Sequence, residues 1–252
     1  LILTASCLKP KLEREVRAFK AFQKFIDTYN KKYDSVEEYM ARFRIFKFNL
    51  FKNRRARSWK TGITKFSDLT ETEFARKYLT LNLSFKKYHL VKPQESNPAP
   101  EKFNWLDKGV LGEIKDQAQC GSCWAFSTVA NMEAQAKIQF NKTVRLSEQM
   151  LVDCDTNNMG CNGGNMDLSF EWMMENGGIM SEEDYPYVAF DDDCKMKKEK
   201  LIVGVTDYTR LDSDDEKDIK EFLYSTGPLA VALNANPLQT YIGGILDPST
   251  WE

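Results

Sequence analysis

A cysteine at the expected start of a helix is the residue of this sequence best placed to do chemistry. Cys123 follows Gly121 and Ser122 and opens a stretch with a helical pattern, and Gln117 lies six residues upstream. The N-terminus of a helix carries partial positive charge and unpaired N–H groups, which favour a thiolate over a thiol. Because the thiolate is the nucleophilic form of cysteine, the sequence predicts that Cys123 acts as a nucleophile.

Two other uses of the cysteines compete with this interpretation. Cys120 and Cys123 have the spacing of a thioredoxin-type redox pair, but the aromatic residue that precedes such a motif is absent. Cys120, Cys123, Cys154 and Cys161 could bind zinc by number. The second pair is seven residues apart, however, which is wider than the usual spacing of zinc ligands. We therefore predict no metal ion and no other cofactor.

The first hundred residues show the apolar period of helices. Two stripes have this period: Val16, Phe19, Phe22, Ile26 and Tyr29, and then Tyr39, Phe43, Phe46 and Leu50. Ser35 with Glu38, and Thr70 with Glu73, have the spacing of a capping box, which marks the start of a helix. This part is predicted to be helical.

The later residues change period, and a proline-rich segment separates the two parts. Residues 91–100 carry three prolines, which predicts an extended, exposed linker open to proteolysis. Residues 201–208 and 227–235 are predicted to be strands, and residues 214–224 a short acidic helix. His89, just before the linker, is predicted to be solvated.

Several independent motifs resemble the papain family of cysteine peptidases. Cys120-Gly-Ser-Cys123-Trp is the local signature of the nucleophile in that family, and Cys161-Asn-Gly-Gly is a second hallmark. The resemblance implies that Cys123 attacks the carbonyl carbon of peptide bonds in proteins and peptides. It also implies that the Gln117 side chain and the Cys123 N–H form the oxyanion hole. Ala118 stands where the family usually has glycine.

The same resemblance implies a binding site for the substrate. Gly163 and Gly164 would pair with an extended peptide, since glycine allows close approach of another backbone. Met166 and Ala232 would line the main specificity pocket. We expect an apolar residue to be preferred just before the scissile residue, because methionine is apolar and adaptable. The alternative for Met166 is a core methionine on the helix that follows.

The resemblance also implies two disulfides, Cys120–Cys161 and Cys154–Cys194, with Cys123 free. Disulfides form in oxidising compartments, so a lysosomal or secreted protein is expected. The sequons at Asn82 and Asn141 fit this route. Cys7 has no evident partner.

The N-terminal part resembles the propeptide of papain-like zymogens, most of all the cathepsin F type. The residues that match its two motifs are Glu38, Arg42, Phe46 and Asn49, and then Gly62, Phe66 and Asp68. Asn53, Arg57 and Thr64 depart from the pattern. The resemblance implies that this propeptide inhibits its own enzyme, that cystatin-type inhibitors are further partners, and that the protein is a monomer.

The predicted fold class is α+β. A helical inhibitory propeptide would span residues 1–90, with an apolar stub of a secretory signal at its start. The linker with its activation cleavage would span 91–100. Residues 101–252 would form an incomplete papain-like fold, with a helical left domain and a partial β-barrel right domain.

Charge is distributed unevenly between the two parts. Residues 1–100 hold 22 Lys and Arg against 10 Asp and Glu, whereas residues 101–252 hold 13 against 27. Because the basic residues are woven into amphipathic helices, we expect mutual attraction of the two parts and no nucleic-acid partner. No apolar run approaches the ~18 residues of a membrane span.

The general base is the missing part of this constellation. In the family the catalytic His and Asn lie roughly 130–150 residues after the nucleophile, here at about 253–273. The sequence ends at Glu252, and its one histidine is His89. We therefore expect the chain as written to lack the base. The alternative function is an inactive pseudopeptidase, or a propeptide-type inhibitor or scaffold.

Overall fold

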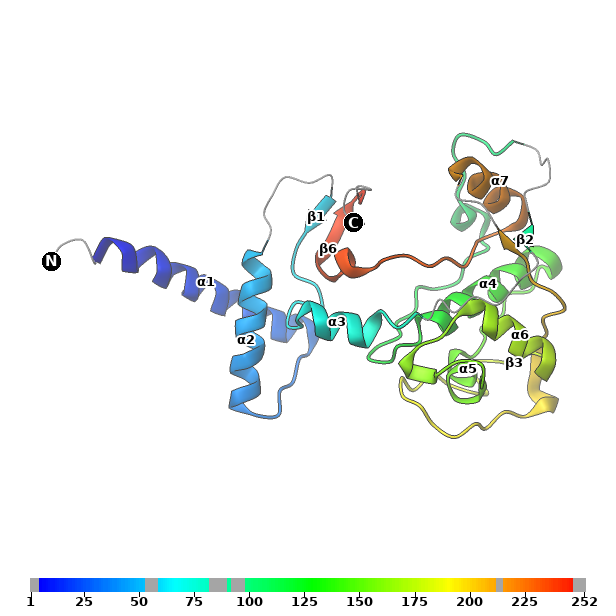
Figure 1. Cartoon of the computed structure of the whole chain (residues 1–252), viewed down its shortest axis with the longest axis horizontal. Helices are drawn as coiled ribbons and strands as arrows, with labels where there is room; N and C mark the ends of the chain where they lie inside the picture. Colours follow the sequence, from blue (N-terminus) through cyan, green and yellow to red (C-terminus); the bar gives the residue numbers. More distant parts are fainter. Residues whose placement is uncertain (1–4, 53–58, 82–89, 92–97, 212–214, 247–252) are drawn as a thin grey trace. The chain divides into compact units, whose positions relative to one another are not determined.

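The computed structural model describes all residues except 1–4, 53–58, 82–89, 92–97, 212–214 and 247–252 (Figure 1). The chain forms two compact units, which we call the first unit (residues 1–76 and 234–252) and the second unit (residues 77–233). This division by packing differs from the functional division at 91–100, which stays a prediction. His89, Asn82 and the side chain of Cys7 lie outside the described part.

Two crossing helices, α1 (Ala5–Tyr29) and α2 (Val36–Phe51), build the core of the first unit (Figure 1). Its buried members are aromatic apart from one alanine: Ala18, Phe22, Phe25, Phe43 and Phe46. The stripe predicted for α2 is found at the core. The stripe predicted for α1 is partly wrong, because Val16 and Phe19 are 47% and 46% exposed. The crossing with α2 covers only one stretch of α1, and the covered face is the one that carries Ala18 and Phe25.

The predicted capping boxes are present, one of them with a shifted partner. Thr70 Oγ1 accepts from Glu73 N at 3.1 Å, and Thr70 N donates to Glu73 Oε2 at 2.8 Å, just before α3 (Glu71–Tyr78). At α2, Ser35 Oγ accepts from Glu38 N at 3.0 Å. The Glu38 carboxylate accepts from Asp34 N, whereas in a capping box it would accept from the N–H of Ser35, one residue later.

One side of α2 holds the loop that precedes α3. Arg42 donates to Glu73 Oε1 at 2.9 Å and to Asp68 O at 3.2 Å, and Glu38, four residues earlier on the same helix, lies at 3.9 Å. Asn49 Nδ2 donates to Ser67 O and Leu69 O. The motif residues of α2 therefore act on the backbone of a later segment.

Asp68 is the buried end of this loop. Its carboxylate accepts from Lys31 Nζ and from the Tyr33 hydroxyl, both at 3.0 Å. Burial, together with the Asp68 carboxylate, raises the pKa of Tyr33, so its phenol remains a neutral donor. Asp68 thereby ties the loop to the segment between α1 and α2.

Glu73→Gln should destabilise the first unit by about 1 kcal/mol at pH 7. Burial opposes ionisation of Glu73, but bonds from Thr70 and Arg42 outweigh it and lower the pKa of this carboxyl. A carboxyl whose pKa is lowered by folding contributes stability that is fully present above its unfolded-state pKa. This stability is lost as the pH falls through the folded-state pKa. Hydrogen exchange of α1 and α2 amides, corrected for intrinsic rates, should therefore show a difference at pH 7 that disappears in acid.

Glu71→Gln on the same helix is the matched control for this prediction. Glu71 pairs with Lys52, but its side chain is 71% exposed. We expect the control to have little effect at either pH, because exposed pairs contribute little. Equal losses in the two variants, or a Glu73 effect that persists in acid, would contradict the prediction.

A short sheet completes the first unit. Strands β1 (Trp59–Thr61) and β6 (Tyr241–Gly244) pair antiparallel, with Trp59 opposite Gly244. The 3₁₀ turn Asn236–Thr240 precedes β6. In it the buried Gln239 donates to Leu69 O at 2.9 Å. A Cβ at Gly62 would lie 2.7 Å from the side chain of Ile242, which gives a packing reason for glycine in this motif.

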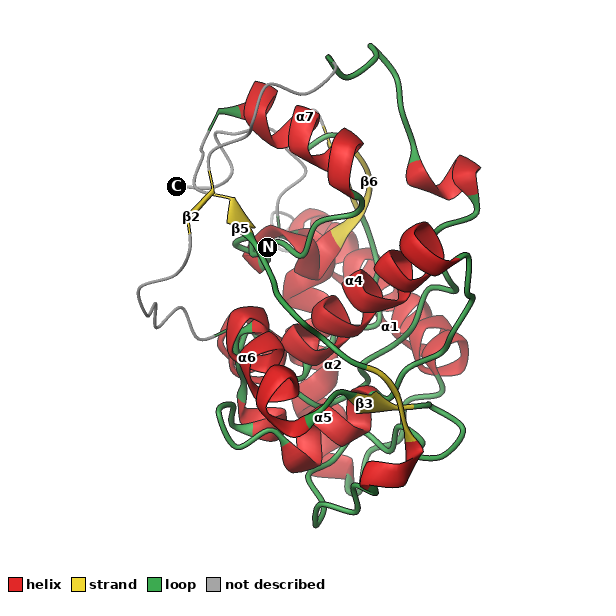
Figure 2. Cartoon of the chain, turned by 90° about the vertical axis from the view of Figure 1, so that its right-hand side faces the viewer, coloured by secondary structure: helices red, strands yellow, loops and turns green. Residues whose placement is uncertain are grey.

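Three helices form the core of the second unit (Figure 2): α4 (Cys123–Phe140), α5 (Glu148–Cys154) and α6 (Met166–Asn176). Trp124, Leu146, Met150 and Met173 are among its fully buried side chains. Strands β3 (Ile179–Met180) and β4 (Leu201–Val203) pair antiparallel beside the helices. Among the described helices, none is both long and apolar enough to cross a membrane.

Two strand predictions for the later residues are wrong or too long. Only Leu201–Val203 of the stretch 201–208 is a strand, and residues 228–235 form none. A strand needs a neighbour for its backbone bonds, and no described segment pairs with 228–235. Strand β2 (Leu90–Val91) pairs parallel with β5 (Arg210–Leu211). The predicted acidic helix is present as α7 (Glu216–Thr226), shifted by two residues.

The remaining regular elements are short 3₁₀ turns. They span Trp105–Lys108, Gly160–Asn162 and Lys198–Lys200. The first is anchored to α7, because Trp105 Nε1 donates to Leu223 O at 3.0 Å. The second lies directly before Gly163 and Gly164, so it helps to shape the candidate site.

Candidate functional site

Cys123 is the first residue of α4 and the one cysteine among the described side chains that is outside a disulfide. Burial raises the pKa of its thiol, whereas the backbone N–H groups of Trp124 and of Cys123 itself, together with Thr80, lower it without outweighing burial. The helix terminus thus acts in the predicted direction. It does not by itself make a thiolate in this half-buried state, so deprotonation needs exposure or a base.

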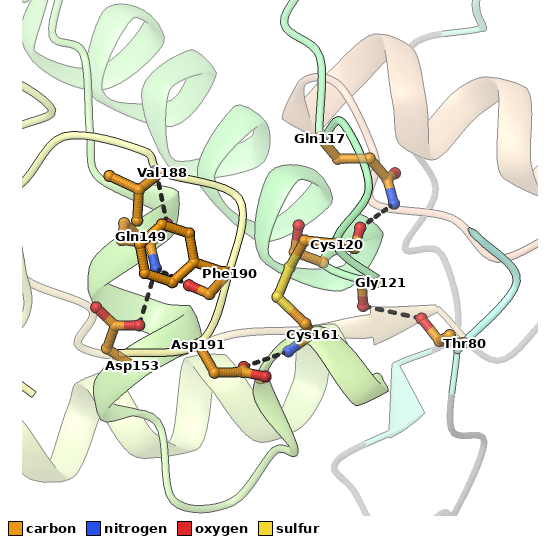
Figure 3. The surroundings of a disulfide bond; sticks show 12 residues. Thr80, Gln117, Cys120, Gly121, Gln149, Asp153, Cys161, Val188, Phe190 and Asp191 are labelled. Atoms are coloured by element: carbon orange, nitrogen blue, oxygen red, sulfur yellow. Dashed lines mark hydrogen bonds between the residues drawn. A yellow bond between two sulfur atoms is a disulfide. The ribbon is translucent and has the colours of Figure 1, made fainter. Parts of the chain in front are cut away.

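The loop before α4 carries Gln117, whose side chain points towards Cys120 (Figure 3). Gln117 Nε2 donates to Cys120 O at 2.8 Å, which fixes the amide near the start of the helix. Ala118 adopts a left-handed φ of 52°, and its N–H donates to Asp116 Oδ1 at 2.9 Å. Left-handed backbone costs a non-glycine residue roughly 1–2 kcal/mol. This geometry gives the physical reason why glycine suits the position after Gln117.

Two disulfides clamp the site, and they join the pairs that the resemblance implied. Cys120 bonds Cys161 (Figure 3), and Cys154 bonds Cys194. The first bridge links the nucleophile loop to the loop that ends at Gly163. The thioredoxin and zinc interpretations are both wrong, because Cys120, Cys154 and Cys161 are all consumed by these bonds.

Gly163 and Gly164 form an edge that a second backbone approaches closely. A Cβ at Gly163, where φ is 119°, would lie 1.9 Å from the carbonyl oxygen of Thr80. Leu81 forms a parallel β-bridge with Gly164. Glycine is required here on both counts, because no side chain would fit and the backbone is outside the usual region.

The backbone on this edge belongs to the chain itself. We call residues 77–81 the covering segment. Thr80 Oγ1 donates to Gly121 O at 2.8 Å (Figure 3), and Lys77 Nζ donates to Gln119 Oε1 at 2.8 Å. Thr80 also lowers the pKa of the Cys123 thiol, against the larger effect of burial. The covering segment therefore occupies the space next to the nucleophile.

The other predicted site residues are placed less directly. Met166 is 9% exposed and packs in the core of the second unit, as the alternative for this residue proposed. Ala232 is exposed in the loop 228–235. A specificity pocket formed by both stays a prediction.

Sequence reasoning missed three residues around the nucleophile. Thr80 gave no signal, because its importance comes from a fold that returns it to Cys123. Ser122 and Tyr187 gave none either, although the Tyr-Pro-Tyr run at 185–187 stands out in the sequence. Tyr187 contacts both Ser122 and Gln117 across about 65 to 70 residues of chain.

Comparison with known proteins agrees with this geometry. Residues 99–252 match the Papain family cysteine protease domain, and residues 22–74 match the Cathepsin propeptide inhibitor domain (I29). A probable cysteine protease of Arabidopsis thaliana, RD19B, is 39% identical over 95% of this chain and 70% of its own length. Cysteine proteinase 15A of Pisum sativum is 40% identical over 90% of this chain and 67% of its own.

Solved structures show the same likeness in three dimensions. A digestive procathepsin L2 proteinase from the midgut of Tenebrio molitor larvae superposes with a TM-score of 0.86 at 30% identity. The match covers 92% of this chain and 80% of that one. A recombinant stem bromelain precursor gives a TM-score of 0.81 at 31% identity, with coverage of 91% and 76%.

Proposed function

Because the chain belongs to the papain family of cysteine proteases and carries a cathepsin propeptide inhibitor domain, we propose that Cys123 is the nucleophile of this zymogen. Its sulfur adds to the carbonyl carbon of a peptide bond and forms an acyl-enzyme, while the amine leaves with a proton. Water then adds to the acyl carbon and releases the acid and the thiol. The free thiol at the start of α4 supports this role.

Gln117 and the Cys123 backbone would stabilise the oxyanion of this reaction. The bond from Gln117 to Cys120 O uses one of the two amide protons, so the other remains available. Each donor to a developing oxyanion is worth about 3 kcal/mol in transition-state stabilisation. Fixing the amide in advance avoids the cost of ordering it during the reaction.

The covering segment supplies the single observation that carries the zymogen mechanism. Thr80 and Leu81 lie on the Gly163–Gly164 edge where an extended substrate would pair, and the bridge to Gly164 is parallel. We propose that this direction is the non-productive one, so that the segment occupies the substrate site without being cut. Burial of Cys123 raises the pKa of its thiol, which favours the protonated form in the zymogen.

Further properties follow as proposals from the family and the site. Substrates would be proteins and peptides with an apolar residue before the scissile one, recognised near Met166 and Ala232. Activation would cleave within 91–100. The protein would act as a monomer in a lysosomal or secretory compartment, and cystatin-type inhibitors would bind it. The two disulfides support the oxidising compartment.

Thiol labelling tests the proposed nucleophile. The 252-residue chain, without reductant, is treated with iodoacetamide at pH 7.5 before and after an acid pulse, and modified cysteines are mapped by mass spectrometry. We expect labelling of Cys123, at least about 10-fold faster when acid has loosened the covering segment. Cys123→Ala should abolish it, and a Cys7→Ser variant controls for any labelling at Cys7.

Turnover measured in parallel separates the peptidase from the inactive alternative. For these 252 residues a reactive Cys123 without hydrolysis is expected. Their one histidine is His89, which is predicted to be solvated and not to act as the general base. Hydrolysis would show that another group acts as the base. A Cys123 that stays unreactive after the acid pulse would overturn the proposed function.

A further inference from the structure

Ser122 occupies the N-cap position of α4, yet its hydroxyl does not cap the helix. At α2, α5, α6 and α7 the N-cap side chain accepts a backbone N–H, as Ser147 does from Met150 N at 2.9 Å. Ser35 caps α2 in the same way. Ser122 is fully buried, so its hydroxyl needs a partner elsewhere.

That partner is Tyr187. The two hydroxyl oxygens lie 2.7 Å apart, and the Tyr187 hydroxyl donates to Gln117 O at 2.8 Å. A phenol carries one proton. Since that proton goes to Gln117 O, the Ser122 hydroxyl donates to the Tyr187 oxygen. The Ser122 oxygen is thereby held away from the end of α4.

Tyr187 is itself well fixed. Its ring packs edge-on against Phe126 on the first turn of α4, with centroids 4.9 Å apart. Its backbone N–H donates to Glu182 Oε1 at 3.0 Å. Burial raises the pKa of its phenol; Ser122 lowers it, and the carboxylates of the three acidic residues around it raise it further. These residues are Glu148, Asp116 and Asp191. The phenol therefore stays a neutral donor.

Because the Ser122 hydroxyl bonds to Tyr187, it does not accept a backbone N–H at the start of α4. A capping hydroxyl at Ser122 would accept the N–H of Trp124, the second helical residue, because the Ala125 N–H already donates to Ser122 O at 2.9 Å. The Trp124 N–H instead lowers the pKa of the Cys123 thiol, although burial keeps that pKa above its usual value. Serine oxygen and cysteine sulfur would compete for this donor.

We propose that Tyr187 is a positioning residue that holds the Ser122 hydroxyl and the Gln117 carbonyl, so that the Trp124 N–H is not taken by the serine and stays available to the Cys123 sulfur. The inference rests on the proposed role of Cys123 as nucleophile. It assigns one side chain to both halves of the machinery, the sulfur and the loop of the oxyanion donor.

A double-mutant cycle in the full chain tests it. The rate of Cys123 alkylation by iodoacetamide is measured against pH for wild type, Tyr187→Phe, Ser122→Ala and the double variant. Tyr187→Phe frees the serine to cap the helix. In this variant the pH profile of Cys123 alkylation should shift up by about one pH unit, and the alkylation rate at pH 7 should fall about 10-fold. Ser122→Ala, which cannot cap, should show no upward shift, and the double variant should return towards wild type.

Tyr185→Phe is the matched control. Tyr185 is two residues away and is buried, whereas Tyr187 is half-buried, and the Tyr185 hydroxyl donates to Asp153 Oδ2 at 2.8 Å. The pH profile of Cys123 alkylation in Tyr185→Phe should match that of wild type. An unchanged Tyr187→Phe profile, or a shift that the double variant retains in full, would overturn the inference while leaving the proposed function intact. Absence of alkylation in wild type would instead overturn the proposed function.

Discussion

Lys115→Met is expected to lower the free energy of unfolding of the second unit by about 3–5 kcal/mol at pH 7. Lys115 Nζ contacts Glu133 Oε1 at 2.8 Å and Glu148 Oε1 at 2.6 Å. The Glu148 side chain is 2% exposed, and Glu133 Oε1 also accepts from Leu146 N. Removing the ammonium leaves two carboxylates in the interior without their counter-charge, and urea denaturation measures the loss.

The loss should shrink as the pH falls. Burial raises the pKa of Glu148 even in the native protein, and Lys115 opposes that rise. Without the lysine the folded-state pKa rises further, so the folded variant binds a proton at a higher pH than the unfolded chain does. A carboxyl with such a raised folded-state pKa destabilises the fold less as the pH falls. We therefore expect a smaller difference between variant and wild type at pH 5 than at pH 7.

Lys102→Met is the control, because Lys102 is exposed on the same unit. Its effect should stay within about 0.5 kcal/mol. A loss below about 1 kcal/mol for Lys115→Met, or one that grows in acid, would show that the carboxylates are already neutral or well hydrated.

Phe46→Ala should unfold or nearly unfold the first unit, at a cost of about 3–5 kcal/mol. Phe46 is fully buried, and its ring lies 5.1 Å from Phe22 and 5.0 Å from Phe25. A small helical unit has few other buried side chains to compensate. Hydrogen exchange should show lost protection in α1 and α2 while α4 to α6 stay protected.

Phe48→Ala provides a control of the same residue type on the same helix. Phe48 is 64% exposed, so its removal should cost well under 1 kcal/mol. We also expect faster alkylation of Cys123 in Phe46→Ala, since the covering segment continues directly from α3. Equal protection in the two variants would contradict the assignment of Phe46 to the core.

Local chemistry allowed several features to be predicted before the fold was known. The capping pairs Ser35–Glu38 and Thr70–Glu73 involve neighbours in sequence, so their spacing is sufficient evidence of a helix start. The nucleophile was found in the same way, because Cys123 opens a helix after a glycine and a serine. Membership of the papain family was indicated by motifs that are equally local.

Features that depend on distant partners were predicted less well. The apolar period of α1 could not tell which face would meet α2, and the core took Phe25 in place of Phe19. The run 227–235 has strand-like residues, but strand formation depends on a partner that the residue pattern does not contain. Arg42 lies 3.9 Å from Glu38 on its own helix, but its shorter bond to Glu73, across the loop, depends on the tertiary structure.

The sequence by itself determined several helix starts and, through its family motifs, the candidate nucleophile, the disulfide pairs and the class of enzyme. Only the tertiary structure showed that Thr80 covers Cys123, that Met166 packs in a core and that Tyr187 takes the Ser122 hydroxyl from the helix end. The physical reason is range. Caps and helical periods act over three or four residues, whereas hydrogen bonds and burial at the site join residues tens of positions apart, and only a folded backbone brings these together.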